Sequence, residues 1–209
     1  MKPTIIINFK TYKQGTEVLR WAKIIEKINR DIIIGIQATD LFQMSHNTKI
    51  KIYAQHTDYF EPGRNTGFIL PESLKANGAD GTFLNHSEHR LDFKVLEKTI
   101  DRCKKIKLKT AVFAKNLNEA KKIEKLKPDL LIIEPPELIA GNVSVSDSRP
   151  ELIKNIAKSL KTNFLVGAGI HSNQDLKVAL KLGASGIALS SAIMTSKNPE
   201  KILKELIYG

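Results

Sequence analysis

The stretch TIIINF, residues 4–9, decides the fold, because it is a run of β-branched and apolar residues that lacks any regular alternation with polar ones. Such a run is typical of a strand in a parallel sheet that is covered on both faces. Similar runs recur along the whole chain. They lie at residues 32–36, 50–55, 82–85, 108–113, 130–134, 164–166 and 186–189. The sequence therefore predicts eight short strands in series.

Helical patterns separate these strands. Their apolar residues are spaced three and four apart, so that each helix can cover a sheet with one face. One such stripe contains Val18, Trp21, Ala22, Ile25 and Ile28, and another contains Leu152, Ile153, Ile156 and Leu160. Two helix starts are also marked, because Ser172 with Asp175 predicts a capping box and Asn198-Pro199 predicts an N-cap followed by proline.

Eight strands that alternate with helices predict an α/β fold, namely a closed (β/α)₈ barrel formed by a single domain over residues 1–209. An open, doubly wound sheet has the same local pattern and remains an alternative. Neither a proline- or serine-rich linker nor a low-complexity tract divides the chain.

Composition restricts the class of protein. The chain is 42% hydrophobic and 26% charged, as in ordinary globular proteins, and no apolar stretch is long enough for a membrane helix. Because no cleavable apolar segment follows Met1, we expect a cytoplasmic protein. The net charge of +11 suits an anionic partner, either a nucleic acid or a small phosphate. Acidic residues are interleaved with the lysines and few aromatic residues accompany them, which favours solvated helix faces over a nucleic-acid site.

The single cysteine, Cys103, can form neither an intramolecular disulfide nor a multi-thiolate zinc site. It falls on the apolar spacing of Phe93, Leu96 and Ile100. We therefore expect a thiol packed in the core.

Polar residues at the carboxyl ends of the predicted strands are the candidates for chemistry, because the active sites of barrel enzymes lie at that face. Asn8 and Lys10 close the first strand, with side chains on the same face if the backbone is extended. A lysine there can stabilise a phosphate or a developing oxyanion. A solvated strand end is the alternative interpretation.

His86 and Glu88 follow the fourth strand, and Glu134 ends the sixth. Backbone amides of a turn after the strand can hydrogen-bond the His86 imidazole and favour its neutral form. Pro135 disfavours helical dihedral angles at Glu134, which holds that residue extended at the strand end. A partly desolvated carboxylate is a stronger base than one in water, although Glu134 also suits a salt bridge.

Glycines after the last two strands indicate an anion site, since these loops often bind phosphate in barrels. The residues are Gly167-Ala168-Gly169, followed by Gly183 and Gly186. A dinucleotide site is disfavoured, because the segment lacks the third glycine of that motif.

In this order, the motifs resemble the triosephosphate isomerase family and specifically its short archaeal branch. The resemblance spans nearly the whole chain, and it depends on five segments. They are Asn8-Phe9-Lys10, His86-Ser87-Glu88, Glu134-Pro135-Pro136-Glu137-Leu138-Ile139, Gly167-Ala168-Gly169-Ile170 and the region of the eighth strand. The resemblance implies a TIM barrel that interconverts dihydroxyacetone phosphate and glyceraldehyde 3-phosphate through an enediolate, without metal or organic cofactor.

The resemblance also implies residue roles, in which the surroundings of a glutamate and a histidine tune their pKa values for catalysis. Glu134 is the expected base, His86 the neutral electrophile and Lys10 the cation, while Asn8 and Glu88 support them. Residues 135–145 resemble a lid that closes over the substrate phosphate. The residues expected to bind substrate are Asn8, Lys10, Ala140, Gly141, Gly167, Ala168, Gly169, Ser190 and Ser191.

Two segments depart from the family pattern. Ala140-Gly141-Asn142 stands where Gly-Thr-Gly is usual, and Ser190-Ser191-Ala192 where Ala-Ser-Gly is usual. The resemblance further implies a homodimer or homotetramer without nucleic-acid or membrane partners, in which Thr66 of one chain reaches towards Asn8 and Lys10 of its neighbour. The alternatives are another phosphate-binding barrel enzyme (a lyase or transferase), a basic nucleic-acid-binding protein, and an isomerase that has lost activity.

Overall fold

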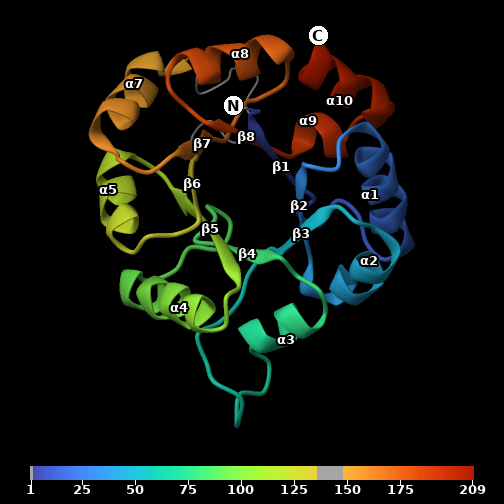
Figure 1. Cartoon of the computed structure of the whole chain (residues 1–209), viewed down its shortest axis with the longest axis vertical. Coiled ribbons are helices and arrows are strands. Elements are labelled where there is room, and N and C mark those ends of the chain that lie inside the picture. Colours follow the sequence, from blue (N-terminus) through green and yellow to red (C-terminus); the bar gives the residue numbers. More distant parts are fainter. Residues whose placement is uncertain (1, 136–147) are drawn as a thin grey trace.

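A computed structural model describes residues 2–135 and 148–209. Eight parallel strands form a closed barrel in sequence order, with β1 paired to β8, so the prediction of a closed barrel is confirmed and the open sheet is wrong. Figure 1 looks into the barrel, with helices around it. The strands are β1 (Thr4–Asn8), β2 (Ile33–Ile36), β3 (Lys51–Ala54), β4 (Gly81–Leu84), β5 (Lys109–Ala114), β6 (Leu130–Ile133), β7 (Phe164–Val166) and β8 (Gly186–Leu189).

Helices follow the strands and form the outer ring. In the described part of the chain they are α1 (Thr16–Ile28), α2 (Leu41–Asn47), α3 (Pro71–Ala76), α4 (Phe93–Lys105), α5 (Leu117–Lys125), α7 (Pro150–Ser159), α8 (Asn173–Lys181), α9 (Ser191–Met194) and α10 (Pro199–Tyr208), with a 3₁₀ turn, η1 (Ala38–Asp40). Ser172 and Asp175 form the predicted capping box of α8. Asn198 caps α10 and accepts a hydrogen bond from the amide of Lys201. Both predicted helix starts are therefore confirmed.

The strands are apolar on both faces because each strand contributes to two cores. Inside the barrel, Ile6 of β1 packs with Phe83, Phe113 and other inward side chains. Its neighbours Ile5 and Ile7 point outward and pack under the helices. Successive side chains of a strand alternate between the two cores, so an alternation of apolar and polar residues is absent.

The outer core contains the predicted helix stripes. Val18, Trp21, Ala22 and Ile25 of α1 are buried there. Cys103 is fully buried in the same core, and burial raises the pKa of its thiol to about 12. The expectation of a thiol packed in the core is confirmed.

The seam between the first and last strands requires a glycine. Thr4 pairs with Gly186 in the register of β1 and β8. A Cβ atom at Gly186 would overlap the carbonyl oxygen of Thr4. Gly186 therefore permits barrel closure, and it does not line the pocket described below.

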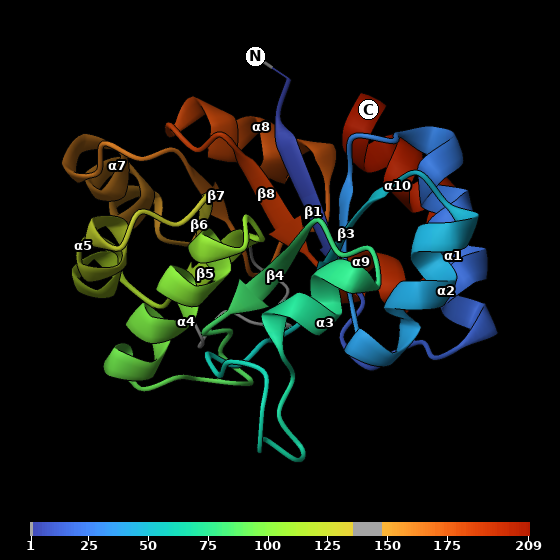
Figure 2. The ribbon, with the colours of Figure 1, turned by 60° about the horizontal axis from the view of Figure 1, so that its bottom comes forward.

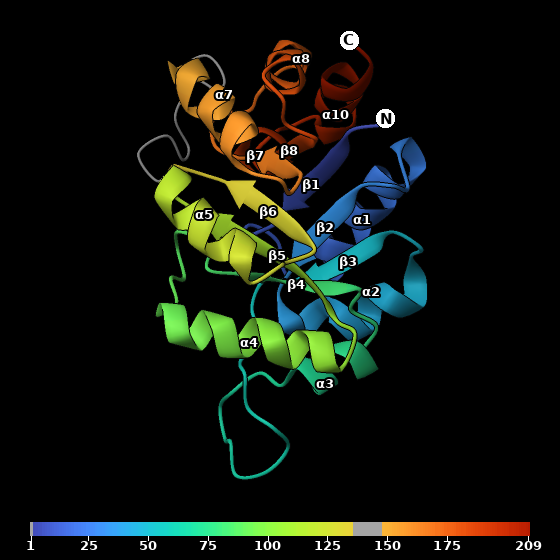
Figure 3. The same cartoon turned by 60° about the vertical axis from the view of Figure 1, so that its left-hand side comes forward.

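The loop between β3 and α3 is the most prominent projection from the ring, as Figures 2 and 3 show from two directions. Thr66 is exposed in this loop. Across residues 2–135 and 148–209, no helix combines the length and apolar character that crossing a membrane requires.

Candidate active site

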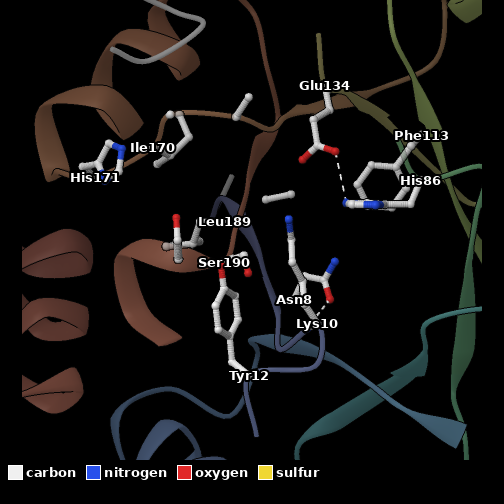
Figure 4. A pocket seen from close by; sticks show the side chains of 14 residues that line it. Asn8, Lys10, Tyr12, His86, Phe113, Glu134, Ile170, His171, Leu189 and Ser190 are labelled. Carbon is white, nitrogen blue, oxygen red and sulfur yellow. Dashed lines mark hydrogen bonds and ion pairs between the residues drawn. The ribbon is translucent and has the colours of Figure 1, made fainter. Parts of the chain in front are cut away.

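A pocket lies at the carboxyl ends of the strands and collects side chains from across the barrel (Figure 4). Of the predicted site residues, eight line it: Asn8, Lys10, His86, Glu134, Ala168, Gly169, Ser190 and Ser191. Asn8 is the last residue of β1, and the others follow β1, β4, β6, β7 and β8. Since the strands run parallel, their carboxyl ends meet at one mouth, and residues far apart in sequence come together there.

Asn8 and Lys10 share the pocket, but not for the predicted reason. Strand β1 ends at Asn8, and Lys10 has a left-handed backbone with φ 46°, so the segment is not extended through Lys10. This conformation is uncommon for a non-glycine residue. The Asn8 Oδ1 atom accepts a hydrogen bond from the Lys10 amide at 2.9 Å, and Gln55 Nε2 donates to the Lys10 carbonyl at 2.7 Å. These bonds stabilise the bend at Lys10.

The ammonium group of Lys10 is paired with Glu88. Its Nζ atom lies 2.7 Å from Glu88 Oε1, and the Lys10 side chain is 17% exposed whereas that of Glu88 is 57% exposed. The carboxylate therefore holds the ammonium from the solvent side. A substrate anion entering the pocket can compete with Glu88 for Lys10 without leaving a carboxylate buried.

The His86 imidazole is buried and has hydrogen-bond partners at both ring nitrogens. The Glu88 amide donates to Nδ1 at 3.2 Å. Because an acceptor nitrogen carries no proton, we assign the neutral ring with its hydrogen on Nε2. The Glu88 carboxylate oxygen nearest Nδ1 is 3.6 Å away, too far for a hydrogen bond. The expectation that a backbone amide of the following turn hydrogen-bonds His86 is confirmed.

Glu134 directly follows β6, and its amide extends the strand pairing by donating to the Ala114 carbonyl at 2.9 Å. Its Oε2 atom lies 3.2 Å from His86 Nε2 and 3.5 Å from Ser87 Oγ. In Figure 4 the carboxylate and the imidazole lie next to each other on one side of the pocket, joined by a dashed line. The Glu134 side chain is only 11% exposed.

Gly167 contributes to the site by its lack of a side chain. A Cβ atom there would lie 3.0 Å from Glu134 Oε1 and 3.3 Å from Glu134 Cβ. Gly167 thus leaves space for the carboxylate. It was predicted to supply an anion-binding amide, whereas Ala168 and Gly169, and not Gly167, line the pocket.

The loops after β7 and β8 form the opposite side of the pocket. Ala168 and Gly169 both have positive φ, 76° and 66°. After β8, Ser190 precedes the short helix α9, and its buried Oγ atom has no hydrogen-bond partner among the described residues. A loop pair of this kind with a short extra helix is a frequent phosphate site in barrels.

Other predicted residues lie elsewhere. Gly183, with φ 103°, terminates α8, and its amide donates to the Leu180 carbonyl, so its role is to end a helix. Ala140 and Gly141, with the rest of the predicted lid after Pro135, fall within 136–147, outside the described residues. Glu88 lines a neighbouring hollow of about 610 Å³ that also borders Asn8 and Lys10.

Sequence reasoning missed several pocket residues. Tyr12, Phe113, Ile170, His171 and Leu189 also line the pocket. Phe113 contacts His86 edge-on, with ring centroids 4.7 Å apart and planes at 78°. The position of Phe113 near the carboxyl end of β5 is the one signal that could have found it, since every strand end opens towards the same mouth.

A closed parallel barrel with a carboxylate, an imidazole and an ammonium group at the carboxyl ends of its strands defines the class of (β/α)₈ barrel enzymes. Comparison with known proteins specifies the family. The family model for triosephosphate isomerase matches residues 3–206. The chain belongs to the triosephosphate isomerase family.

Curated archaeal relatives agree with this assignment. A triosephosphate isomerase of Methanocaldococcus jannaschii is 41% identical over 97% of this chain and 98% of its own length. One of Saccharolobus solfataricus is 42% identical over 98% of this chain and 95% of its own, and one of Metallosphaera sedula is 37% identical over 99% and 95%. These similarities extend along almost the entire chain.

Proposed function

We propose that this member of the family is a triosephosphate isomerase, which interconverts dihydroxyacetone phosphate and glyceraldehyde 3-phosphate. The observation that carries the proposal is the 3.2 Å contact between Glu134 Oε2 and His86 Nε2 in a pocket that Lys10 also lines. A base, a neutral hydrogen-bond donor and a cation are the groups that proton transfer next to a carbonyl requires. Family membership supports the same reaction.

In the proposed reaction, Glu134 removes a proton from the carbon beside the substrate carbonyl. The electron pair of that C–H bond forms the enediolate, whose negative oxygen accepts hydrogen bonds from His86 Nε2 and from Lys10. His86 donates its Nε2 proton to this negative oxygen and takes up the proton of the neighbouring substrate hydroxyl, so the negative charge moves to the other oxygen. The Glu134 carboxylic acid then returns its proton to the adjacent carbon, and the second oxygen becomes the new carbonyl. Every step is a proton transfer within the pocket, so these side chains suffice for the chemistry.

Substrate must replace two existing contacts. The substrate oxygen takes the Nε2 hydrogen that Glu134 now accepts, and the substrate anion competes with Glu88 for Lys10. Glu134 becomes available as a base only when its carboxylate leaves His86. Binding and activation of the base are coupled in this way.

We place the substrate phosphate against Ala168, Gly169, Ser190 and Ser191. The Ser190 hydroxyl supports this placement, because it finds no hydrogen-bond partner in the described part of the chain and buried polar atoms normally have one. Residues 135–145 are proposed as the lid over this site. Their amides, including those of Ala140 and Gly141, are proposed as further donors.

We also propose that the working form is a dimer or tetramer. The projecting loop after β3 supports this idea, because exposed Thr66 lies in it while a hollow beside Asn8 and Lys10 offers space to a neighbouring chain. Thr66 is the residue that we propose reaches that hollow.

Deuterium exchange tests the proposed function. Dihydroxyacetone phosphate is incubated with the protein in D₂O, and proton NMR follows both the appearance of glyceraldehyde 3-phosphate and deuterium at the exchanged carbon. A Glu134→Gln preparation, purified identically, controls for contaminating host enzyme. Absence of both products with the unaltered protein would refute the proposal, as would equal rates with Glu134→Gln.

A further inference from the structure

Asn85, the residue before His86, is held in an unusual conformation by its own side chain. It has a left-handed backbone with φ 61° and is 2% exposed. Asparagine tolerates this region better than most non-glycine residues. The bend that follows β4 turns the chain so that His86 enters the pocket.

Every polar atom of the Asn85 side chain is used. Its Nδ2 atom donates to the carbonyl of Phe113 on β5 at 2.9 Å and to Glu119 Oε1 on α5 at 3.3 Å. Its Oδ1 atom accepts from the amide of Leu91 at 3.1 Å, which closes the turn formed by residues 85–91. This turn contains both His86 and Glu88.

Glu119 secures the other end of the turn. Its Oε1 atom pairs with Arg90 Nη2, while Arg90 Nη1 donates to the Asn85 carbonyl at 3.0 Å. The second carboxylate oxygen accepts from the Lys115 amide at 2.7 Å. The side chain of Glu119 is 19% exposed, so much of this network is sheltered from water. Hydrogen bonds are stronger in such a sheltered environment than in water.

The network acts on the atoms that determine the state of His86. Within the turn, the Glu88 amide donates to His86 Nδ1 at 3.2 Å, and the His89 amide donates to the His86 carbonyl at 2.9 Å. Asn85 also holds the backbone of Phe113, whose ring covers the imidazole. Loosening the turn would move the Glu88 amide away from Nδ1 and free the ring to change its tautomer.

We infer that Asn85 and Glu119 are positioning residues, which hold the turn of residues 85–91 so that His86 keeps its hydrogen on Nε2, directed into the pocket. Neither residue lines the pocket, so both act through His86. The expected effect on turnover rests on the proposed function, whereas the expected tautomer of His86 does not depend on it.

The test combines NMR with kinetics on two variants. Asn85→Gly accepts the left-handed backbone but removes all three side-chain hydrogen bonds, and Glu119→Gln keeps the shape while removing the charge that pairs with Arg90. The ¹⁵N shifts of the imidazole are measured near neutral pH in the full chain, with the His86 signals assigned by their loss in His86→Gln. We expect a single Nε2–H tautomer in the unaltered protein and a mixture of imidazole tautomers in both variants.

In both variants we also expect kcat to fall about tenfold with KM changed less than about twofold, because the lost interaction matters most in the transition state.

Glu72→Gln is the matched control. It breaks the Arg102–Glu72 ion pair between α3 and α4, which involves no atom of the turn. It should lower the melting temperature and leave the His86 tautomer and kcat unchanged. A fixed Nε2–H tautomer in both Asn85→Gly and Glu119→Gln would overturn the inference, whatever their turnover. If His86→Gln retained full turnover, the proposed role of His86 would fail, while the NMR result would still decide the tautomer question.

Discussion

His86 Nε2 and Glu134 Oε2 lie 3.2 Å apart, so the ring proposed to stabilise the enediolate oxygen and the proposed base are hydrogen-bonded to each other. The carboxylate reaches this position from the end of β6, and the imidazole reaches it from the turn after β4. In the proposed reaction, the Glu134 carboxylate must move from His86 to a substrate carbon. Whether it reaches that carbon depends on the length of the glutamate side chain.

Shortening Glu134 is therefore the most direct test of its role. Glu134→Asp keeps the charge but withdraws the carboxylate by one methylene, and a misplacement of about 1 Å can cost roughly 10²-fold in rate. We expect turnover to fall by about 10² or more in a coupled assay, with little change in melting temperature. Glu134→Gln, which removes the basicity, should be at least as damaging. Near-normal turnover in both variants would exclude Glu134 as the base.

Gly167 should be intolerant of even one methyl group. In Gly167→Ala, the new Cβ would lie 3.0 Å from Glu134 Oε1 and 3.4 Å from Glu134 Cγ, closer than the carboxylate can accept without moving. We expect kcat to fall by about tenfold or more, following the displacement of the base. Circular dichroism should show an intact fold. Unchanged kcat would mean that Glu134 does not need the space beside Gly167.

Ser190 should affect phosphate binding and stability in opposite directions. Its buried hydroxyl has no hydrogen-bond partner in residues 2–135 and 148–209, so Ser190→Ala should leave the melting temperature unchanged or slightly higher. If the hydroxyl binds the substrate phosphate, the same change should weaken competitive inhibition by inorganic phosphate several-fold.

Ser185→Ala is the control for Ser190, because the Ser185 hydroxyl donates to the Phe164 carbonyl at 2.9 Å. This variant should lose stability and keep its affinity for phosphate. Phosphate that does not compete with substrate in the unaltered protein would rule out the proposed phosphate site.

His56 should make stability depend on pH. Burial lowers the pKa of His56 below its usual 6.5, and the nearby His89 lowers it further, although Asp58 opposes both effects. As pH falls below about 6.5, the unfolded chain binds a proton that the folded chain does not, so stability decreases. We expect the melting temperature to drop between pH 7 and pH 5, and to drop less in His56→Phe. Equal slopes for the two proteins would contradict this assignment.

Oligomer formation should be required for full activity if Thr66 completes the neighbouring site. We expect sedimentation at assay concentrations to show at least a dimer. Thr66→Arg, which adds bulk and charge at the projecting loop, should dissociate it and lower activity together. A monomer with full activity would show that the site is complete within one chain.

The sequence predicts the strands well because their signal is local. Each predicted strand bound lies within one residue of the observed one. Closure of the barrel is not local, since it depends on pairing between Thr4 and Gly186 across almost the whole chain, and the pattern alone left an open sheet possible. The hydrogen bonds that bend the chain at Lys10 come partly from Gln55, which directly follows β3, so the extended geometry predicted there was wrong.

In the site, too, features with a local sequence signal could be predicted, whereas those that depend on contacts between distant residues could not. Strand-end position and chemistry identified Glu134, His86 and Lys10, and the structure brings all three to one pocket. The spatial relations of Gly167 with Glu134 and of Asn85 with Glu119 join residues that are separate in sequence. No single-sequence pattern encodes such contacts, because they depend on how the strands are staggered in the barrel.

Closure of β8 against β1 also determines when the protein can become functional during its synthesis. Lys10 is synthesised before β2 to β8, whereas Ser190 and Ser191, which line the same pocket, are synthesised after β8. A nascent chain that lacks β8 leaves an edge of β1 unpaired and its inward apolar residues uncovered. The pocket can therefore assemble only after β8 has been synthesised, and until then the growing chain depends on partial structure or on chaperones to avoid aggregation.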